Sequence, residues 1–238
     1  ADIVVTEAGF GSDMGAEKFM HIKAATSGKA PDCVVMNVTI RSMKLHGGAF
    51  GNRGGYRPSK EELESENVEA VKAGAMTNLD RHIKNMSAFG VPVIVSINKF
   101  ASDTDNEISA LKDVAHASGA NSVTITEVHA KGGEGGEDLA KAVVKSVQDH
   151  VAAGRPFTPL FVNDAPILDK IEAIATRMYK AKDVYLEAKA KKQLEQINSW
   201  GYGHLPVCMA KTQYSFSHDA GKLGAPSGFT LPVREFRL

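Results

Sequence analysis

The sequence predicts an α/β fold, in which a doubly wound, mostly parallel sheet is followed by a smaller C-terminal lobe of helices and strands. Strand-like runs alternate with helix-like stretches over the first 150 or so residues, as in a parallel sheet with crossover helices. The run VPVIVSI (91–97) is continuously apolar, which a parallel strand covered on both faces requires. This alternation ends after Arg155-Pro156. We therefore predict a ligand-binding portion at 1–155 and a C-terminal lobe at 156–238.

Each element of the first portion has a local signal. Apolar, β-branched runs bounded by turn residues predict strands at 2–5, 33–40, 91–97 and 122–128. Apolar residues at helical spacing predict helices at 16–25, 61–90, 103–117 and 137–152. Glycine marks an interruption of the second helix near Gly74, and Asp103 or Thr104 is suited to cap the third. The glycine-rich stretch 47–55 predicts a mobile loop.

The C-terminal lobe is less clearly patterned. Amphipathic segments predict helices at 164–178 and 186–200, joined by residues 180–183. Apolar runs predict strands at 205–210 and 228–233. These strands either continue the first sheet or form a separate lobe, and the sequence leaves both arrangements open.

Composition narrows the class of protein. The 238 residues carry 28 Lys and Arg against 28 Asp and Glu, which gives no bulk attraction to nucleic acid or to an anionic membrane. No apolar run approaches the roughly 20 residues that span a bilayer, and the N-terminus lacks a signal-peptide pattern. We expect a cytoplasmic protein with Cys33 and Cys208 as buried free thiols, a disulfide between them being the alternative. The strand-like runs near both ends suggest a piece of a longer chain.

Four loops should gather at the carboxyl ends of the strands, where ligands bind in open parallel sheets. They lie at 6–11, 41–48, 98–103 and 129–136, and each is rich in glycine or polar residues. Such residues are also common in loops without function. Glycines at 132–136 precede a helix and would let backbone N–H groups approach an anion. The chain contains no Walker loop, and its eight histidines lack metal-site spacing, so we predict no metal ligands.

The loop after the strand at 91–97 has two notable features. Asn98-Lys99 is similar to the base-reading loop of P-loop GTPases, but Ala101 stands where that loop has Asp, which argues against guanine recognition. Phe100 at the end of a strand is well placed to stack on a flat heterocycle, although a core position is an equal alternative.

Five segments carry a family resemblance. They read TEAGFGSDMGAEKF (6–19), RSMKLHGG (41–48), GVPVIVSINKFASDTDNE (90–107), AKGGEGG (130–136) and LPVCMAKTQYSFS (205–217), and they resemble segments of formate–tetrahydrofolate ligases in the same order. The resemblance implies a P-loop NTPase type of α/β fold. It also implies that formate is joined to tetrahydrofolate, using ATP and a formyl phosphate intermediate, to give 10-formyltetrahydrofolate.

The resemblance carries further expectations about partners and completeness. It implies ATP with Mg²⁺ and tetrahydrofolate as ligands, help from a monovalent cation, and a homo-oligomer, often a tetramer. The family's phosphate-binding loop belongs upstream of residue 1, and the family chain continues beyond Leu238. We therefore expect these residues alone to be incomplete for catalysis.

The resemblance also suggests residue roles. The family clamps the pterin ring between Phe and Trp. Phe100 matches the former, and His129 stands at the Trp position, which predicts looser folate binding with some pH sensitivity. Arg41 and Lys44 are further sources of positive charge, or solvated surface residues. The predicted catalytic residues are Glu7, Lys99 and Lys131. The predicted ligand-binding residues are Phe100, His129, Asn98, Gly9, Gly11, Gly132, Gly133 and Gly135.

Two other functions are compatible with the residues. One is a P-loop-type nucleotide-binding regulatory module, against which the missing Walker loop and Ala101 count. The other is a non-catalytic interaction domain. A glycine-rich loop with Lys and Thr encoded upstream would separate the ligase from the interaction domain.

Overall fold

The chain folds as two compact units. The computed structural model describes residues 1–51 and 57–238, so part of the predicted loop 47–55 lies outside the described residues. Unit 1 comprises residues 1–30, 159–218 and 226–238, and unit 2 comprises 31–158 and 219–225. The division at residue 155 that the sequence suggests stays a prediction.

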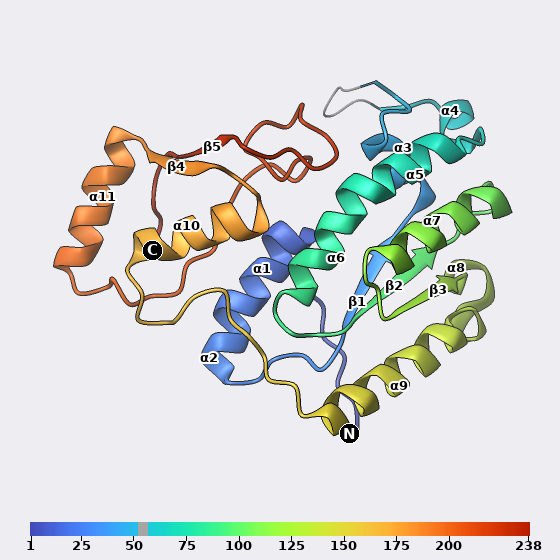
Figure 1. The fold of residues 1–238 in the computed structure, drawn as a ribbon, viewed down its shortest axis with the longest axis horizontal. Helices are drawn as coiled ribbons and strands as arrows, with labels where there is room; N and C mark the ends of the chain where they lie inside the picture. Colours follow the sequence, from blue (N-terminus) through green and yellow to red (C-terminus); the bar gives the residue numbers. More distant parts are fainter. Residues whose placement is uncertain (52–56) are drawn as a thin grey trace. The chain divides into compact units, whose positions relative to one another are not determined.

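Unit 2 is built on a parallel sheet (Figure 1). Strand β2 (Val93–Asn98) lies between β1 (Val34–Val38) and β3 (Ser122–Thr126), and it pairs parallel with both. Residues 93–97 of β2 are all buried, which confirms the interpretation of the VPVIVSI run as a strand covered on both faces. Because the three strands are parallel, their carboxyl ends all lie at the same edge of the sheet.

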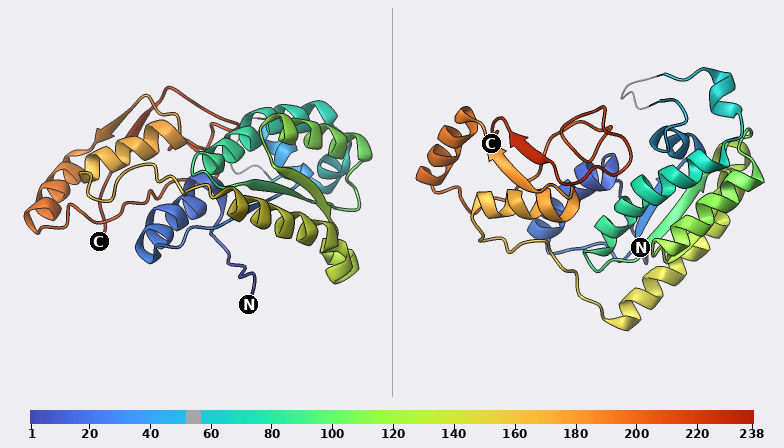
Figure 2. Two further views of the ribbon diagram at one scale, coloured as in Figure 1. Left: turned by 60° about the horizontal axis from the view of Figure 1, so that its bottom comes forward. Right: turned by 45° about the horizontal axis from the view of Figure 1, so that its top comes forward.

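Helices cover both faces of this sheet. Figure 2 shows α6 (Asp80–Ser87) and α7 (Asp105–Ala117) on one face and α9 (Glu137–Ala153) on the other. Thr104 caps α7 through a capping box, because its side chain accepts a hydrogen bond from the Glu107 N–H and the Glu107 side chain accepts one from the Thr104 N–H. Among its described residues the unit also contains α3 (Ile40–His46), α4 (Lys60–Glu64), α5 (Val68–Gly74), α8 (Val128–Lys131) and the 3-10 helix η4 (Gly132–Gly136).

The predicted interruption at Gly74 is wrong. Helix α5 continues through the π-helical turn η3 (Ala75–Leu79) into α6. A Cβ at Gly74 would lie 2.1 Å from the carbonyl oxygen of Met43, so glycine there permits close packing of α5 on α3. The helical run is instead interrupted before Asn67, whose side chain caps α5 by accepting from the Ala70 N–H at 3.0 Å.

Unit 1 contains a helical segment at 11–27 and a second, two-stranded sheet. The segment is made of η1 (Gly11–Gly15), α1 (Ala16–Lys18), η2 (Phe19–Ala24) and α2 (Ala25–Ser27). Strand β4 (Asp183–Leu186) pairs parallel with β5 (Thr230–Val233). Helix α10 (Ile167–Ala173), its extension η5 (Ile174–Met178) and α11 (Ala188–Ser199) complete the unit. The C-terminal strands therefore form a sheet of their own.

Three expectations about unit 1 are wrong. Residues 2–5 are not a strand, and Val4 and Val5 are 77% and 86% exposed. Residues 205–210 also form no strand, and the Met209 N–H points instead to the Glu17 carboxylate at 3.4 Å. Cys208 is exposed rather than buried, although both cysteines are free as expected. An apolar run becomes a strand only where a neighbouring strand supplies hydrogen bonds.

Within residues 1–51 and 57–238, no helix combines the length and apolar character that crossing a bilayer demands.

Candidate functional site

The loops that follow β1, β2 and β3 meet at one edge of the sheet in unit 2. The Lys99 N–H after β2 donates to the Thr126 carbonyl of β3 at 3.0 Å. Arg41, which follows β1, lies over the ring of Phe100 with its Cζ 4.1 Å from the ring centroid. Two of the predicted loops are partly helical, because α3 overlaps 41–48 and α8 overlaps 129–136. Asn98 and Lys99 are half-buried at this edge.

Phe100 lies at the surface rather than in the core. The residue is 36% exposed, and its backbone is fixed in a turn by Asp103. The Phe100 N–H donates to Asp103 Oδ2 at 2.8 Å, and the Asp103 N–H donates to the Phe100 carbonyl at 3.0 Å. A ring held this rigidly and partly exposed can stack on a flat ligand without losing much side-chain freedom.

The glycines after β3 have different structural reasons to be glycine. Gly132 has φ +58° and ψ −141°, a conformation open essentially only to glycine. A Cβ on Gly135 would lie 2.6 Å from the Glu127 carbonyl carbon, and its carbonyl accepts from the Glu127 N–H at 3.0 Å. A Cβ on Gly133 meets no heavy atom within 4 Å, and its φ is not in the left-handed range. Gly133 is therefore the glycine here whose presence packing does not explain.

Glu127 is a charged residue of this edge that the sequence analysis missed. Its carboxylate pairs with Lys131 at 2.6 Å, and this hydrogen bond lowers the pKa of Glu127 and raises that of Lys131. Lys99 also lowers the pKa of Glu127. The Glu-x-x-x-Lys spacing at 127–131 is the sequence signal that would have found the pair. His129, on α8 between them, is exposed.

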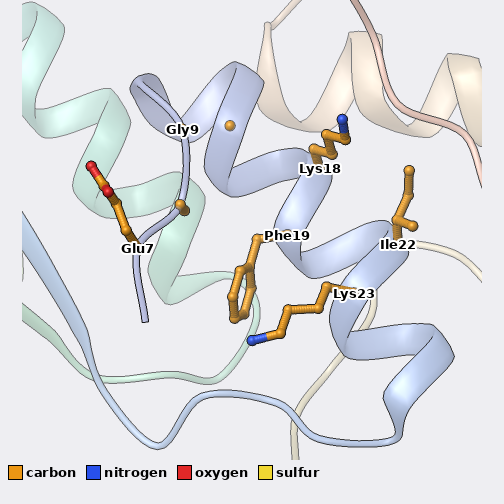
Figure 3. A pocket seen from close by; sticks show the side chains of 8 residues that line it. Glu7, Gly9, Lys18, Phe19, Ile22 and Lys23 are labelled. Carbon is orange, nitrogen blue, oxygen red and sulfur yellow. The ribbon is translucent and has the colours of Figure 1, made fainter. Parts of the chain in front are cut away.

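Two of the three predicted residues of unit 1 line a shallow pocket (Figure 3). Glu7 and Gly9 line it, and its volume is about 210 Å³. Lys18 and Lys23 contribute positive charge, and Lys23 Nζ lies 4.2 Å from the Phe19 ring centroid. The sequence analysis missed these three helix residues, of which Phe19 and Lys23 are four residues apart and so lie on the same face of the segment 11–27. Gly11, half-buried with φ +78°, begins the helical segment.

The helical segment 11–27 also carries buried charged groups. Asp13 pairs with Lys211, and the Asp13 carbonyl accepts a hydrogen bond from the Tyr179 hydroxyl at 3.0 Å. Glu17 lies 2.6 Å from the His21 ring nitrogen, and burial raises the pKa of Glu17 even though His21 opposes this shift. Asp13 and Glu17 belong to the segment 6–19, and Lys211 belongs to 205–217. Two of the segments that carry the family resemblance thus pack against each other.

No group of three or more His, Cys, Asp or Glu side chains that could hold a metal ion occurs in the part of the chain that the structure describes.

The fold and the edge of the sheet define a class of protein. A parallel α/β sheet that presents an exposed aromatic ring and a glycine-rich turn at its carboxyl edge is typical of proteins that bind heteroaromatic and phosphorylated ligands. Comparison with known proteins narrows this class. The model of the family described as formate–tetrahydrofolate ligase matches residues 1–238, and the chain belongs to that family.

Individual relatives agree with the family match. The chain is 49% identical over all 238 residues to the formate–tetrahydrofolate ligase of Ruegeria sp. (strain TM1040) and covers 40% of that protein. It is 47% identical to that of Granulibacter bethesdensis and 48% identical to that of Dinoroseobacter shibae, again over its whole length, covering 39% and 40% of them. The chain thus spans about two fifths of the length of these curated relatives.

Proposed function

We propose that this chain is part of an ATP-dependent ligase that joins formate to tetrahydrofolate and gives 10-formyltetrahydrofolate. The observation that carries the proposal is the identity of 47–49% to curated formate–tetrahydrofolate ligases over every residue of the chain. Because the chain covers only about 40% of these relatives, we propose that the remaining length contributes to catalysis and that these 238 residues alone are incomplete. The regulatory module and the interaction domain are not favoured, because the relatives are named as ligases.

The proposed reaction proceeds through formyl phosphate. A formate oxygen attacks the γ-phosphorus of ATP, and the bond from that phosphorus to ADP breaks. The N10 amine of tetrahydrofolate then attacks the formyl carbon and loses a proton, while the bond from the formyl carbon to the phosphate oxygen breaks. The protein contributes alignment and fixed positive charge.

In unit 2, we propose that the exposed face of Phe100 stacks on the pterin, with His129 as a second ring at the family's Trp position. Asn98 lies beside Phe100 at the same edge. Lys99 and Lys131 supply positive charge, and Glu127 partly neutralises that of Lys131 through their ion pair. The N–H groups of the turn 132–136 are proposed to bind phosphate oxygens, and they come from Gly132, Gly133 and Gly135.

In unit 1, we propose that the pocket containing Glu7 binds an anion. Lys18 and Lys23 give the pocket positive charge, and the backbone N–H groups of Gly9 and Gly11 are further donors. Glu7 is proposed to orient a bound ligand or water.

Further proposals follow from the family resemblance. They are a P-loop NTPase type of fold, which the helices on both faces of the parallel sheet support, and a homo-oligomer such as a tetramer. Mg²⁺ with ATP and a monovalent cation are also proposed as ligands of the full-length protein. A ligand-binding portion at 1–155 and a cytoplasmic location likewise stay predictions.

The test uses the natural full-length protein with ATP, tetrahydrofolate and formate carrying ¹⁸O. We expect formylated folate and ADP in equal amounts, with one ¹⁸O atom from each formate found in the released phosphate. Phe100→Ala should raise the KM for tetrahydrofolate. The matched control is Tyr185→Ala, which removes another exposed aromatic ring, 55% exposed and 5.7 Å from the Lys191 amino group. Product formed without label in phosphate would refute formyl phosphate, and no product would refute the ligase.

A further inference from the structure

Arg41 occupies one face of the Phe100 ring. It is the second residue of α3, and its guanidinium carbon lies 4.1 Å from the centroid of that ring. Its Nη2 also donates to Ser102 Oγ at 3.5 Å. A planar guanidinium over a ring is held by cation–π attraction and by stacking. The guanidinium thus lies against one face of the ring, while Phe100 as a whole residue is still 36% exposed.

The positive charge of Arg41 lies near the carboxyl group of Asp103. Asp103, which is only 7% exposed, fixes the Phe100 backbone from the same loop. Arg41 Nε and Asp103 Oδ1 are both buried and have no hydrogen-bond partner among the described residues. Burial raises the pKa of Asp103, and the nearby charge of Arg41 opposes that shift. The guanidinium is therefore attracted toward Asp103 as well as toward the ring.

Helix α3 is fixed in the position that holds Arg41 there. Lys44, one turn further along α3, is buried and pairs with Glu107 of α7 at 2.8 Å. Lys44 Nζ also donates to the carbonyls of Leu63 and Ser65 at 3.1 and 2.9 Å. Helix α3 thus contacts the loop between β2 and α7 through Arg41, and it contacts the start of α7 through Lys44.

We propose that Arg41 is a positioning and specificity residue for ring binding at Phe100. It fixes the ring from one side, so that the opposite face is presented to a ligand. A cation on one face draws π-electron density toward itself, which weakens the attraction of the open face for a second cation and favours a neutral, electron-rich ring. The site would therefore select flat, uncharged heteroaromatic rings. The inference rests on the proposed function, in which the pterin of tetrahydrofolate is that ring.

The experiment compares Arg41→Met, Arg41→Lys, Phe100→Ala and the double variant Arg41→Met/Phe100→Ala in the full-length protein. Cation–π contacts predict a rise of about three- to tenfold in the tetrahydrofolate KM for Arg41→Met, with kcat and the KM for ATP changed less than about twofold. Arg41→Lys, which keeps the charge without the planar group, should show a smaller rise. If Arg41 acts through Phe100, the double variant should be no worse than Phe100→Ala alone.

Calorimetric binding of tetrahydrofolate to each variant separates the two proposals. A wild-type protein that binds tetrahydrofolate but makes no product overturns the ligase proposal, and the Arg41 role is then judged on the binding constants. Additive losses in Arg41→Met and Phe100→Ala would overturn the Arg41 role, as would equal losses in kcat and both KM values. Should Arg41→Met fail to fold by circular dichroism, Arg41→Lys decides: an unchanged affinity for tetrahydrofolate, or a loss that adds to that of Phe100→Ala, overturns the proposal.

Discussion

Removing the charge of Glu107 should destabilise unit 2 strongly. Glu107→Gln keeps the size of the side chain but leaves the Lys44 ammonium without a counter-ion at a site where its side chain is 1% exposed. Breaking a buried pair by removing one partner typically lowers the free energy of unfolding by about 3–5 kcal/mol. Lys44 keeps the Leu63 and Ser65 carbonyls as acceptors, so we expect a loss near the lower end, about 3 kcal/mol.

The loss is measurable by urea unfolding followed by circular dichroism at neutral pH. The matched control is Glu137→Gln, which breaks the pair with Lys141, where the two side chains are 61% and 69% exposed. Exposed pairs contribute about 0–1 kcal/mol, so the control should lose less than about 1 kcal/mol. Equal, small losses in both variants would show that Lys44 is not held as a buried charge and would refute the reasoning.

Three further predictions concern single residues. Gly133→Ala should change the free energy of unfolding by less than about 0.5 kcal/mol but lower ligase activity. Gly135→Ala should lower the free energy of unfolding by about 1–3 kcal/mol, because its Cβ would crowd Glu127. A fully active Gly133→Ala variant would exclude close approach of a ligand to residue 133. The raised pKa of Glu17 means that the folded state binds its proton more tightly than the unfolded state, so this group lowers stability as pH rises above its ordinary value of 4.5. Glu17→Gln should flatten that decline in pH-dependent unfolding, and an unchanged slope would contradict the assignment. A thiol reagent should modify exposed Cys208 before half-buried Cys33, and Cys208→Ser should remove the fast phase. A fast phase that persists would come from Cys33 and would contradict the predicted order of reaction.

The sheet of unit 2 could be predicted because its signals are local. A continuous apolar run indicated β2, and a capping residue at 103 or 104 marked the start of α7. The apolar run at 2–5 gave an equally good local signal but has no strand beside it. Strand β4 (183–186) was missed for the opposite reason, since its four residues become a strand only through pairing with β5.

Short helices near the site escaped prediction for a related reason. A helix of seven residues or fewer is unstable alone, because its nucleation is unfavourable. Helix α3 is held by a capping box between Thr39 and Ser42 and by the burial of Lys44, neither of which hydrophobic periodicity reveals. Lys44, considered as a solvated surface residue from sequence, is in fact fully buried. The position of Arg41 on Phe100 follows from α3, so it too required the structure.

The segments that carry the family resemblance divide between two physical tasks. In unit 1, Asp13 and Glu17 are buried. The Asp13–Lys211 pair joins the helical segment to a strand-free stretch far along the chain, whereas Glu17 pairs with His21 on the same segment. A buried pair of this kind contributes little net stability compared with apolar residues of similar volume, but losing one partner is costly. Replacement of either partner alone is therefore disfavoured, whether or not the pair touches a ligand. In unit 2, Phe100 and Gly133 are exposed and neither takes part in a buried charge pair, which makes them the sharper test of ligand binding.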